Sequence, residues 1–315
     1  MTNKERYAEW CSEQSEMPLF MQAWWMDGVC AGKQWDVLLW EDETGKIAAA
    51  LPYLYRKRWW MSYILMPQQT QIGGIWIRED KRQDTEFLNK VADDAAAQLK
   101  SMRLSYYYQK YPVGSPMPAL LKERGFKVKE QITYRIDDLS DLDKVMAKFS
   151  KNKKRQLQKA LTLHADPDMS AEEFYRFHTE CLDEQGKKIT YTREFFMVMY
   201  LKASRLGQCR ILRITTADGE TAAAAFLVWD KQRMYYLIPC YSPRFKDTGA
   251  GALLVWEALK AARQQGVSFD FEGSMIRGVA KHYKQFGSEA NTYYAVHKYY
   301  RPLFWIAVVI NGMRS

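Results

Sequence analysis

The chain has 315 residues, of which 47% are hydrophobic and 14% aromatic, and its 46 Lys and Arg against 37 Asp and Glu give a formal net charge of +9. This apolar content excludes a disordered protein, and the length favours about two domains. The positive charge favours anionic partners such as nucleotides, coenzymes, RNA or acidic lipid surfaces. The five cysteines show no paired spacing and no neighbouring histidine, so we expect neither a disulfide framework nor a metal site.

An apolar run at 302–310 comes nearest to a membrane-spanning segment. It is far shorter than the ~20 residues that cross a bilayer. We therefore expect no transmembrane segment and a cytoplasmic protein. We expect this run to pack on the body of the protein as a final strand or helix, or to make a peripheral contact with a membrane.

The chain contains an internal duplication. A turn glycine and an alanine-rich run at 45–56 return at 219–230, and the segment at 120–126 returns at 282–288. Because the two landmarks recur in the same order, we predict two tandem domains, at 1–138 and 139–315.

The predicted elements follow one order in both copies: two strands joined by a turn, a third strand, a helix, a strand, a helix and a last strand. The first copy occupies 35–136. We predict that the intervening segment, 141–205, is wholly helical. It contains a basic helix at 141–161, a second helix that starts at the capping box 170–173, and a third helix from Thr192. In the second copy we predict strands at 210–216, 221–229, 234–240, 267–271 and 291–299, and helices at 251–264 and 276–286.

The helix at 251–264 lies between two predicted strands, 234–240 and 267–271. A β-α-β crossover of this kind makes its two strands parallel neighbours, whereas the strands joined by tight turns are antiparallel. The predicted fold class is therefore α/β, with two domains that each contain a mixed, mostly antiparallel sheet flanked by helices.

A glycine-containing loop leaves the strand at 234–240 and opens the next helix. Gly249 and Gly251 let backbone N–H groups approach a ligand closely, and a helix N-terminus attracts a pyrophosphate. Lys246 adds a positive charge. An ordinary turn before a helix would also use these glycines, so both readings stay open for the candidate phosphate loop: Lys246, Thr248, Gly249, Ala250 and Gly251.

Two motifs resemble those of the GCN5-related N-acetyltransferase (GNAT) superfamily. The run 246–251 resembles its arginine-or-glutamine, x, x, glycine, x, glycine-or-alanine loop, and 280–287 resembles its later helix motif with Tyr283. The resemblance implies that the loop binds the pyrophosphate of coenzyme A and that Tyr283 protonates the departing thiolate. Leu121 stands at the corresponding position of the first copy, which we expect to be degenerate.

A second resemblance covers most of the chain. Residues 269–274 followed by 283–287, the opening 18–27 and the basic 151–160 resemble the Fem family of bacterial peptidoglycan aminoacyltransferases and the FemAB-like acyltransferases. This resemblance implies that Lys284 lies near the reacting carbonyl. Tyr283, where the Fem family has Phe, and the lack of heptads for a coiled-coil arm favour acyl-CoA over aminoacyl-tRNA as the donor.

Two carboxylates precede the tyrosine helix. Asp270 and Glu272 alternate with phenylalanines, so we expect them to share one face of a short strand, where a buried pair needs hydrogen-bond donors or acid-base work. Glu272 is the candidate base for an acceptor amine, and Asp270 the candidate anchor of the turn at 273–274 beside the substrate. The other predicted substrate contacts are Trp24, Lys154 and Arg155.

The predicted function is the transfer of an acyl group from acyl-CoA, such as acetyl-CoA, to an amine acceptor in a cleft between the tandem domains, without a metal. The acceptor would be a small molecule or a cell-envelope precursor. Two alternatives remain: an aminoacyl-tRNA-dependent transferase acting on a peptidoglycan precursor, and a non-catalytic repeat protein that binds RNA or another anion.

Overall fold

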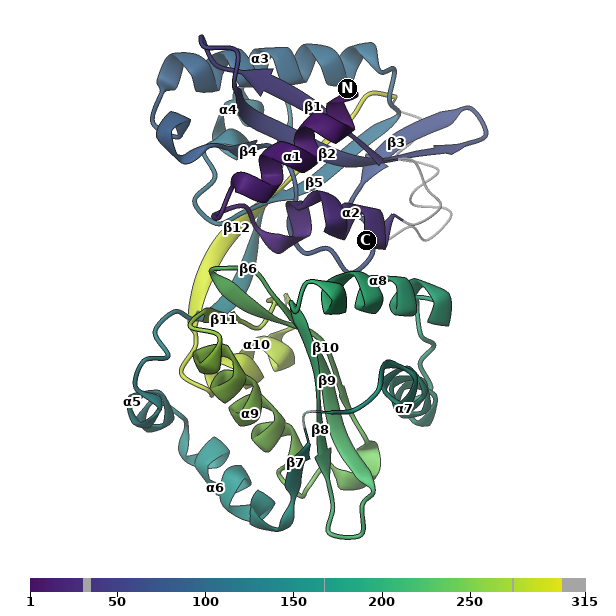
Figure 1. Ribbon diagram of the computed structural model, residues 1–315, viewed down its shortest axis with the longest axis vertical. Coiled ribbons are helices and arrows are strands. Elements are labelled where there is room, and N and C mark those ends of the chain that lie inside the picture. The colour runs from purple at the N-terminus through teal and green to yellow at the C-terminus, as the bar shows by residue number, and fades with distance from the viewer. Residues whose placement is uncertain (31–34, 167, 274, 302–315) are drawn as a thin grey trace. The chain divides into compact units, whose positions relative to one another are not determined.

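The computed structural model describes residues 1–30, 35–166, 168–273 and 275–301. The chain divides into two compact units, one formed by Met1–Gln131 together with the residues from Thr292 onward, the other by Ile132–Asn291 (Figure 1). No helix in these described ranges is long and apolar enough to cross a bilayer. The apolar run at 302–310 and Ser274 lie outside the described residues.

The first unit is a sheet covered by helices, with the strand order β1-β2-β3-β5-β12 and a short β4 paired with β2. Strands β3 and β5 are parallel, and the other neighbours for which a register is given are antiparallel. Its elements are α1 (Asn3–Glu13), α2 (Ala23–Val29), β1 (Trp35–Glu41), β2 (Ile47–Arg58), β3 (Met61–Leu65), β4 (Trp76–Ile77), α3 (Thr85–Ser101), β5 (Tyr106–Tyr111), α4 (Met117–Glu123) and part of β12 (Glu289–Tyr299).

The second unit repeats this arrangement, with the strand order β6-β11-β10-β9-β8-β7. Strands β10 and β11 are parallel, as the crossover predicted, and the sheet is mixed. Its elements are β6 (Lys127–Ile136), which begins in the first unit, α5 (Leu142–Ala147), α6 (Lys151–Lys159), β7 (His164–Asp166), α7 (Ala171–Glu184), α8 (Arg193–Arg205), β8 (Cys209–Thr215), β9 (Thr221–Trp229), β10 (Arg233–Tyr241), α9 (Ala250–Gln264), β11 (Ser268–Asp270) and α10 (Arg277–Lys284).

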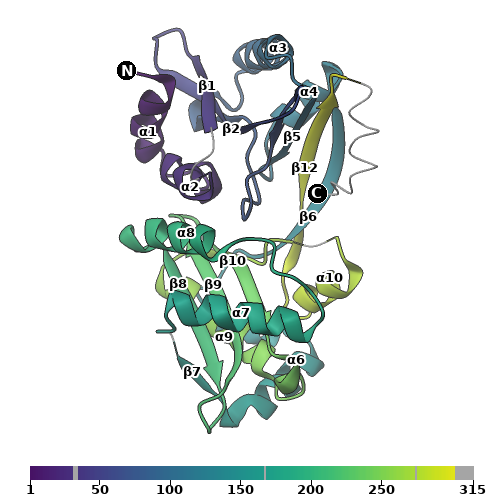
Figure 2. The ribbon, with the colours of Figure 1, turned by 90° about the vertical axis from the view of Figure 1, so that its right-hand side faces the viewer.

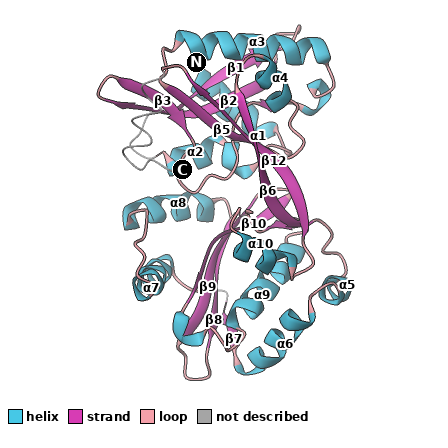
Figure 3. Cartoon of the chain, turned by 180° about the vertical axis from the view of Figure 1, so that it is seen from behind, coloured by secondary structure: helices cyan, strands magenta, loops and turns pink. Residues whose placement is uncertain are grey.

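Helices cover both faces of the second sheet. Helices α7 and α8 lie on one face, where Phe174 and Phe196 contact Phe226 of β9, and α9 and α10 lie on the other (Figure 3). Strand β9 is buried along almost its whole length and carries its small residues Ala223 and Ala225 on the α9 face. Short side chains there let α9 pack closely on the sheet.

The last strand of each copy completes the other copy's sheet. Strand β6 follows β5 in the chain but pairs with β11, whereas β12 follows β11 but pairs with β5, from Tyr294↔Tyr111 to Tyr299↔Tyr106. Figure 2 shows β12 lying along β5. The predicted domain limits, 1–138 and 139–315, therefore differ from the compact units, because a repeated pattern does not tell which copy's last strand pairs with which sheet.

The predicted helical segment between the copies is partly wrong. A short strand, β7, interrupts it and pairs antiparallel with β8, and the basic helix is two helices because Ser150 caps a new one through the N–H of Lys153. Strand β7 is a three-residue edge strand without an apolar run, so no periodicity revealed it. The capping box at Ser170 and the helix start at Thr192 are confirmed.

Candidate active site

Strand β10 of the second unit extends beyond the end of its parallel neighbour β11. Strand β11 pairs with β10 only as far as Tyr235↔Asp270, although β10 continues to Tyr241. The register of β10 against β9 also shifts between Tyr235 and Ile238. The backbone of β10 beyond Tyr235 is thus not hydrogen-bonded to β11, and the candidate phosphate loop follows directly from it.

The candidate phosphate loop is held by its own side chains. Gly249 caps α9 with a positive φ of 87°, a conformation that favours glycine. The hydroxyl of Thr248 donates to the carbonyl of Phe245 at 2.7 Å and accepts from the N–H of Ala250 at 3.3 Å. Lys246 is exposed. The start of α9 therefore has a fixed geometry with a lysine beside it, which suits an anion.

Close packing within the protein also requires a glycine at position 249. A Cβ at this position would overlap the backbone oxygen of Gln156, near the end of α6, and would touch Ala160. A Cβ at Gly251 would instead stand 3.2 Å from the ring of Tyr241. A substitution at Gly249 therefore disturbs the contact between α6 and α9, so Lys246 is the cleaner probe of ligand binding.

A continuous series of aromatic rings connects the candidate phosphate loop with Tyr283. The hydroxyls of Tyr241 and Tyr236 are 2.9 Å apart, and the ring of Tyr236 lies 6.1 Å from that of Phe271. Phe271 stacks on Tyr283 at 4.6 Å with an interplanar angle of 28°. The structure thus brings the loop and the predicted proton donor into one cluster on the α9 face of the sheet.

Tyr283 is 9% exposed. Its pKa is raised to about 12, first by burial and then by the negative charges of Glu272 and Asp270. The amine of the neighbouring Lys284 lies 5.8 Å from the ring of Tyr134. The phenol keeps its proton at neutral pH, and transfer of that proton to a thiolate with a pKa near ~8.5 is uphill by roughly 5 kcal/mol.

Asp270 serves the fold rather than a substrate. It is fully buried, and its carboxylate accepts hydrogen bonds from Thr133, from Nε of Arg135 at 2.8 Å and from the N–H of Glu272 at 2.8 Å. The predicted contact with substrate does not fit these partners. Nor do the two carboxylates share a strand face, because β11 ends at Asp270 and Glu272 lies in the turn that follows.

Glu272 has an unusual backbone conformation for its residue type. Its φ is 64°, in the left-handed region that non-glycine residues rarely adopt. The hydrogen bond from its N–H to Asp270 holds the turn in this form. Strain of this kind gathers at functional sites, and Glu272 is close enough to Tyr283 to raise its pKa. The predicted base and the predicted acid are therefore neighbours.

The structure reveals a basic pair, a buried lysine beside a half-buried histidine, that the sequence prediction missed. The amine of Lys153 is 2.9 Å from Oε1 of Gln156 and 3.1 Å from Nδ1 of His282, and it lies 4.7 Å from the ring of Phe286. Burial lowers the pKa of Lys153 to about 8, and burial followed by the charge of Lys153 lowers that of His282 to about 4. The helical spacing of Lys153 from the apolar Leu157 was the available signal.

The other predicted contacts lie elsewhere. Lys154 donates to the carbonyl of Ala147 at 2.9 Å, and Arg155 is exposed on the same helix. Trp24 belongs to the first unit, where its indole N–H donates to Gln22 at 2.5 Å. In the described part of the chain, no group of three or more acidic, His or Cys residues is placed to hold a metal ion.

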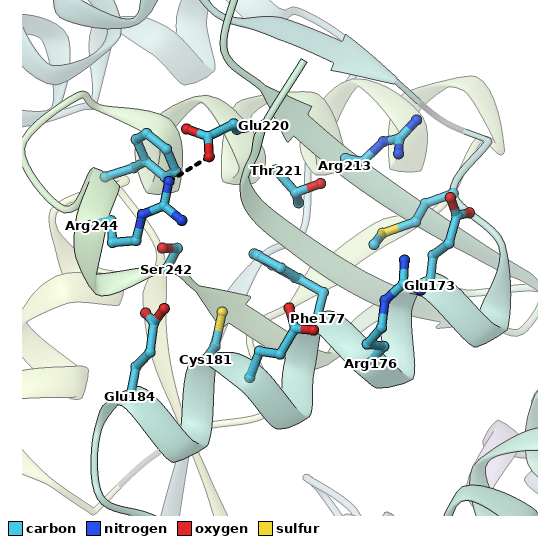
Figure 4. Close-up of a pocket in the computed structure, with 13 residues that line it drawn as sticks. Glu173, Arg176, Phe177, Cys181, Glu184, Arg213, Glu220, Thr221, Ser242 and Arg244 are labelled. Atoms are coloured by element: carbon cyan, nitrogen blue, oxygen red, sulfur yellow. Dashed lines mark hydrogen bonds and ion pairs between the residues drawn. The ribbon is translucent and has the colours of Figure 1, made fainter. Parts of the chain in front are cut away.

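A polar pocket of about 250 Å³ lies on the opposite face of this sheet, between α7 and the end of β10. Figure 4 shows Phe177 and Cys181 of α7 facing Ser242, with an ion pair between Arg244 and Glu220 at its rim. None of the predicted site residues is among the described residues that line it. The sequence held no signal for it because its walls come from separate elements.

Comparison with known proteins identifies the class. Residues 144–285 match the family described as acetyltransferase (GNAT) domain. The crystal structure of FemX covers 93% of this chain and 96% of its own at 14% identity and a TM-score of 0.69. L-PGS from Bacillus licheniformis covers 98% and 97% at 16% identity and 0.57. A tandem GNAT protein from the clavulanic acid biosynthesis pathway covers 94% and 93% at 11% identity and 0.56.

These likenesses define a protein with the tandem GNAT fold. The predicted fold class and the resemblance to GNAT and FemAB-like proteins are confirmed, and the second unit contains the segment that matches the acetyltransferase domain. No curated protein matches the chain in sequence.

Proposed function

We propose that the chain is an acyltransferase that moves an acyl group from acyl-CoA, such as acetyl-CoA, to an amine. The observation that carries the proposal is the aromatic series from the candidate phosphate loop to Tyr283, inside the segment that matches the acetyltransferase domain. This series supports the proposal because it runs from the strand before the loop to Tyr283.

The donor would bind through its phosphates. The backbone N–H groups of Gly249 and Gly251 at the start of α9, together with the charge of Lys246, would hold the pyrophosphate, because helix N-termini attract anions. Thr248 keeps this loop in shape through its two local hydrogen bonds. The acyl-bearing arm would then lie toward Tyr283.

In the proposed reaction a neutral amine attacks the carbonyl carbon of the thioester. Glu272, directly or through water, takes the proton that the amine loses, and Lys284 or a strand N–H stabilises the tetrahedral oxyanion. As the carbon–sulfur bond breaks, the thiolate receives the proton of Tyr283. The raised pKa of Tyr283 keeps this proton in place until the thiolate forms, and the transfer itself stays uphill by roughly 5 kcal/mol.

Aminoacyl-tRNA is the second candidate donor, and the fold of FemX favours it. Helix α6, which carries Lys154 and the exposed Arg155, packs against Gly249 and would supply phosphate contacts beside the same loop. The acceptor would then be an amine of a cell-envelope precursor, and the leaving group would be a ribose hydroxyl instead of a thiolate.

Calorimetry with acetyl-CoA, CoA and tRNA separates these donors. We expect acetyl-CoA to bind and the charge reversal Lys246→Glu to weaken it at least ~10-fold through the lost phosphate contact. The matched control is Lys231→Glu, which changes an exposed lysine in the turn between β9 and β10. Equal affinities in both variants would reject the loop. Binding of tRNA without binding of CoA would replace the donor, and an amine-acylation assay distinguishes an enzyme from a simple anion-binding protein.

A further inference from the structure

The hairpin between β2 and β3 ends in two exposed tryptophans. Arg58 pairs with Met61, so Trp59 and Trp60 form the whole loop, and each is 70% exposed. The other tryptophans in the described part of the chain are buried or half-buried. Large exposed apolar side chains gathered at one point mark interaction sites.

The backbone conformation of this loop does not favour tryptophan. Trp59 has a φ of 56°, and the first central residue of a two-residue hairpin loop with positive φ is best filled by glycine. A bulky residue there is a strained choice, since its Cβ crowds the backbone. The chain therefore tolerates a backbone cost at a position where the aromatic rings make no contribution to a core.

Basic residues surround the two rings. Lys57 and Arg58 are exposed and Arg56 is half-buried, and none of the three forms an ion pair with another described residue. The guanidinium of Arg58 lies 5.3 Å from the ring of Trp59. This tip combines apolar rings with unpaired positive charge.

The hairpin projects from the first unit on a firm base. The pairing given for β1 with β2 ends at Leu54, so among the described residues the last part of β2 pairs with β3 alone (Figure 1). Directly after the loop, the buried Met61 and Tyr63 of β3 pack in a small cluster with the half-buried Tyr106 and Tyr299, whose rings stack at 4.6 Å. The exposed loop is thus joined to a packed aromatic cluster.

We propose that this hairpin tip docks on an anionic membrane surface. Tryptophan prefers the bilayer interface, where its ring enters the apolar boundary and its N–H remains hydrated. Lysine and arginine beside it are attracted to anionic headgroups. The proposal is independent of the acyl donor, and it concerns the first unit, which we expect to lack catalytic groups.

Single-stranded RNA would also favour basic and aromatic residues, but the ring geometry disfavours it. Trp60 stacks on Trp59 at 5.8 Å with an interplanar angle of 29°, and Arg58 also lies against the Trp59 ring. Base stacking requires a free ring face, and the Trp59 ring is already in contact with both Trp60 and Arg58, which leaves the outer face of Trp60 for a base. Interfacial insertion requires no free face, because a stacked pair can enter the headgroup region edge-first.

Vesicle co-sedimentation tests the proposal. We expect the protein to bind phosphatidylcholine vesicles that contain phosphatidylglycerol at least ~10-fold more tightly than pure phosphatidylcholine vesicles, through its basic residues. Trp59→Gly combined with Trp60→Ser should lose this binding while its thermal midpoint stays equal or rises, because glycine relieves the turn. Retention of the midpoint excludes unfolding as the cause.

A matched pair of charge variants completes the experiment. Lys57→Gln with Arg58→Gln should weaken vesicle binding, whereas Lys187→Gln with Lys188→Gln, the same charge loss at exposed positions of the second unit, should not. The proposal is overturned if the wild type ignores anionic vesicles or if the tryptophan variant binds them like the wild type. It is also overturned if that variant loses binding to a single-stranded RNA but not to vesicles.

Discussion

The amine of Lys153 on α6 lies 3.1 Å from Nδ1 of His282 on α10, and Lys153 is buried while His282 is half-buried. This contact ties the basic helix to the helix that carries Tyr283. Since α6 also packs against Gly249, one helix contacts both the candidate phosphate loop and the tyrosine helix.

Replacing Lys153 with Met should stabilise the protein at neutral pH. Burial lowers the pKa of Lys153 from its usual 10.5 to about 8, so below pH 8 the folded state carries a buried charge at a cost of roughly 3 kcal/mol. Between pH 8 and 10.5 the unfolded chain binds more protons, and stability rises with pH. Urea unfolding at pH 7 and pH 10 should show this rise in the wild type and not in Lys153→Met.

Lys151→Met is the control for Lys153, because it removes an exposed amine from the same helix. It should keep the wild-type pH dependence. A strong loss of stability in Lys153→Met at pH 7 would mean that the hydrogen bonds of the amine outweigh the cost of burying it.

Gly249→Ala should cost far more stability than Gly219→Ala. Both glycines have positive φ, at 87° and 81°, so alanine pays the left-handed penalty of about 1–2 kcal/mol at each. Only at Gly249 would the new Cβ also overlap the backbone oxygen of Gln156, whereas nothing lies within 4 Å at Gly219. Equal urea midpoints for the two variants would show that α6 moves aside freely.

Tyr283→Phe should lower kcat by ~10²-fold or more with little change in KM, as expected for loss of a proton donor. Tyr134→Phe removes a hydroxyl from the ring 6.1 Å away and should leave kcat nearly unchanged. Because the pKa of Tyr283 is raised to about 12, its ionisation should not depress the rate up to about pH 10. Steady-state kinetics decide the point: similar losses in the two variants would assign Tyr283 to packing.

Asp270→Asn should destabilise the second unit by about 3–5 kcal/mol, because it leaves Arg135 buried without its counter-charge. Adding Arg135→Gln should recover part of this loss. The exposed pair of Glu172 and Arg193 offers the comparison, and Glu172→Gln should change the urea midpoint little. Full stability in Asp270→Asn alone would show that the hydrogen bonds from Thr133 and Glu272 suffice to hold the turn.

Much of the second copy could be predicted because its local signals agree. The turn at Asp218-Gly219, the alanine-rich β9 and the glycine start of α9 lie where pattern and turn chemistry place them. The sequence also pointed to the loop and to Tyr283, which the fold brings together. It did not reveal that Asp270 is enclosed by Thr133 and Arg135, because those partners come from a strand of the first copy, far away in the chain.

The mutual exchange of last strands sets an order on biosynthesis. The first copy leaves the ribosome long before β12 is synthesised. The edge of β5 that pairs with β12 therefore stays unpaired until most of the chain has been made. Neither copy can form a complete sheet by itself. An isolated copy would lack the strand that the other copy supplies, and its own last strand would be exposed without its partner. The duplication therefore behaves as a single folding unit during synthesis, even though its two sheets have separate cores.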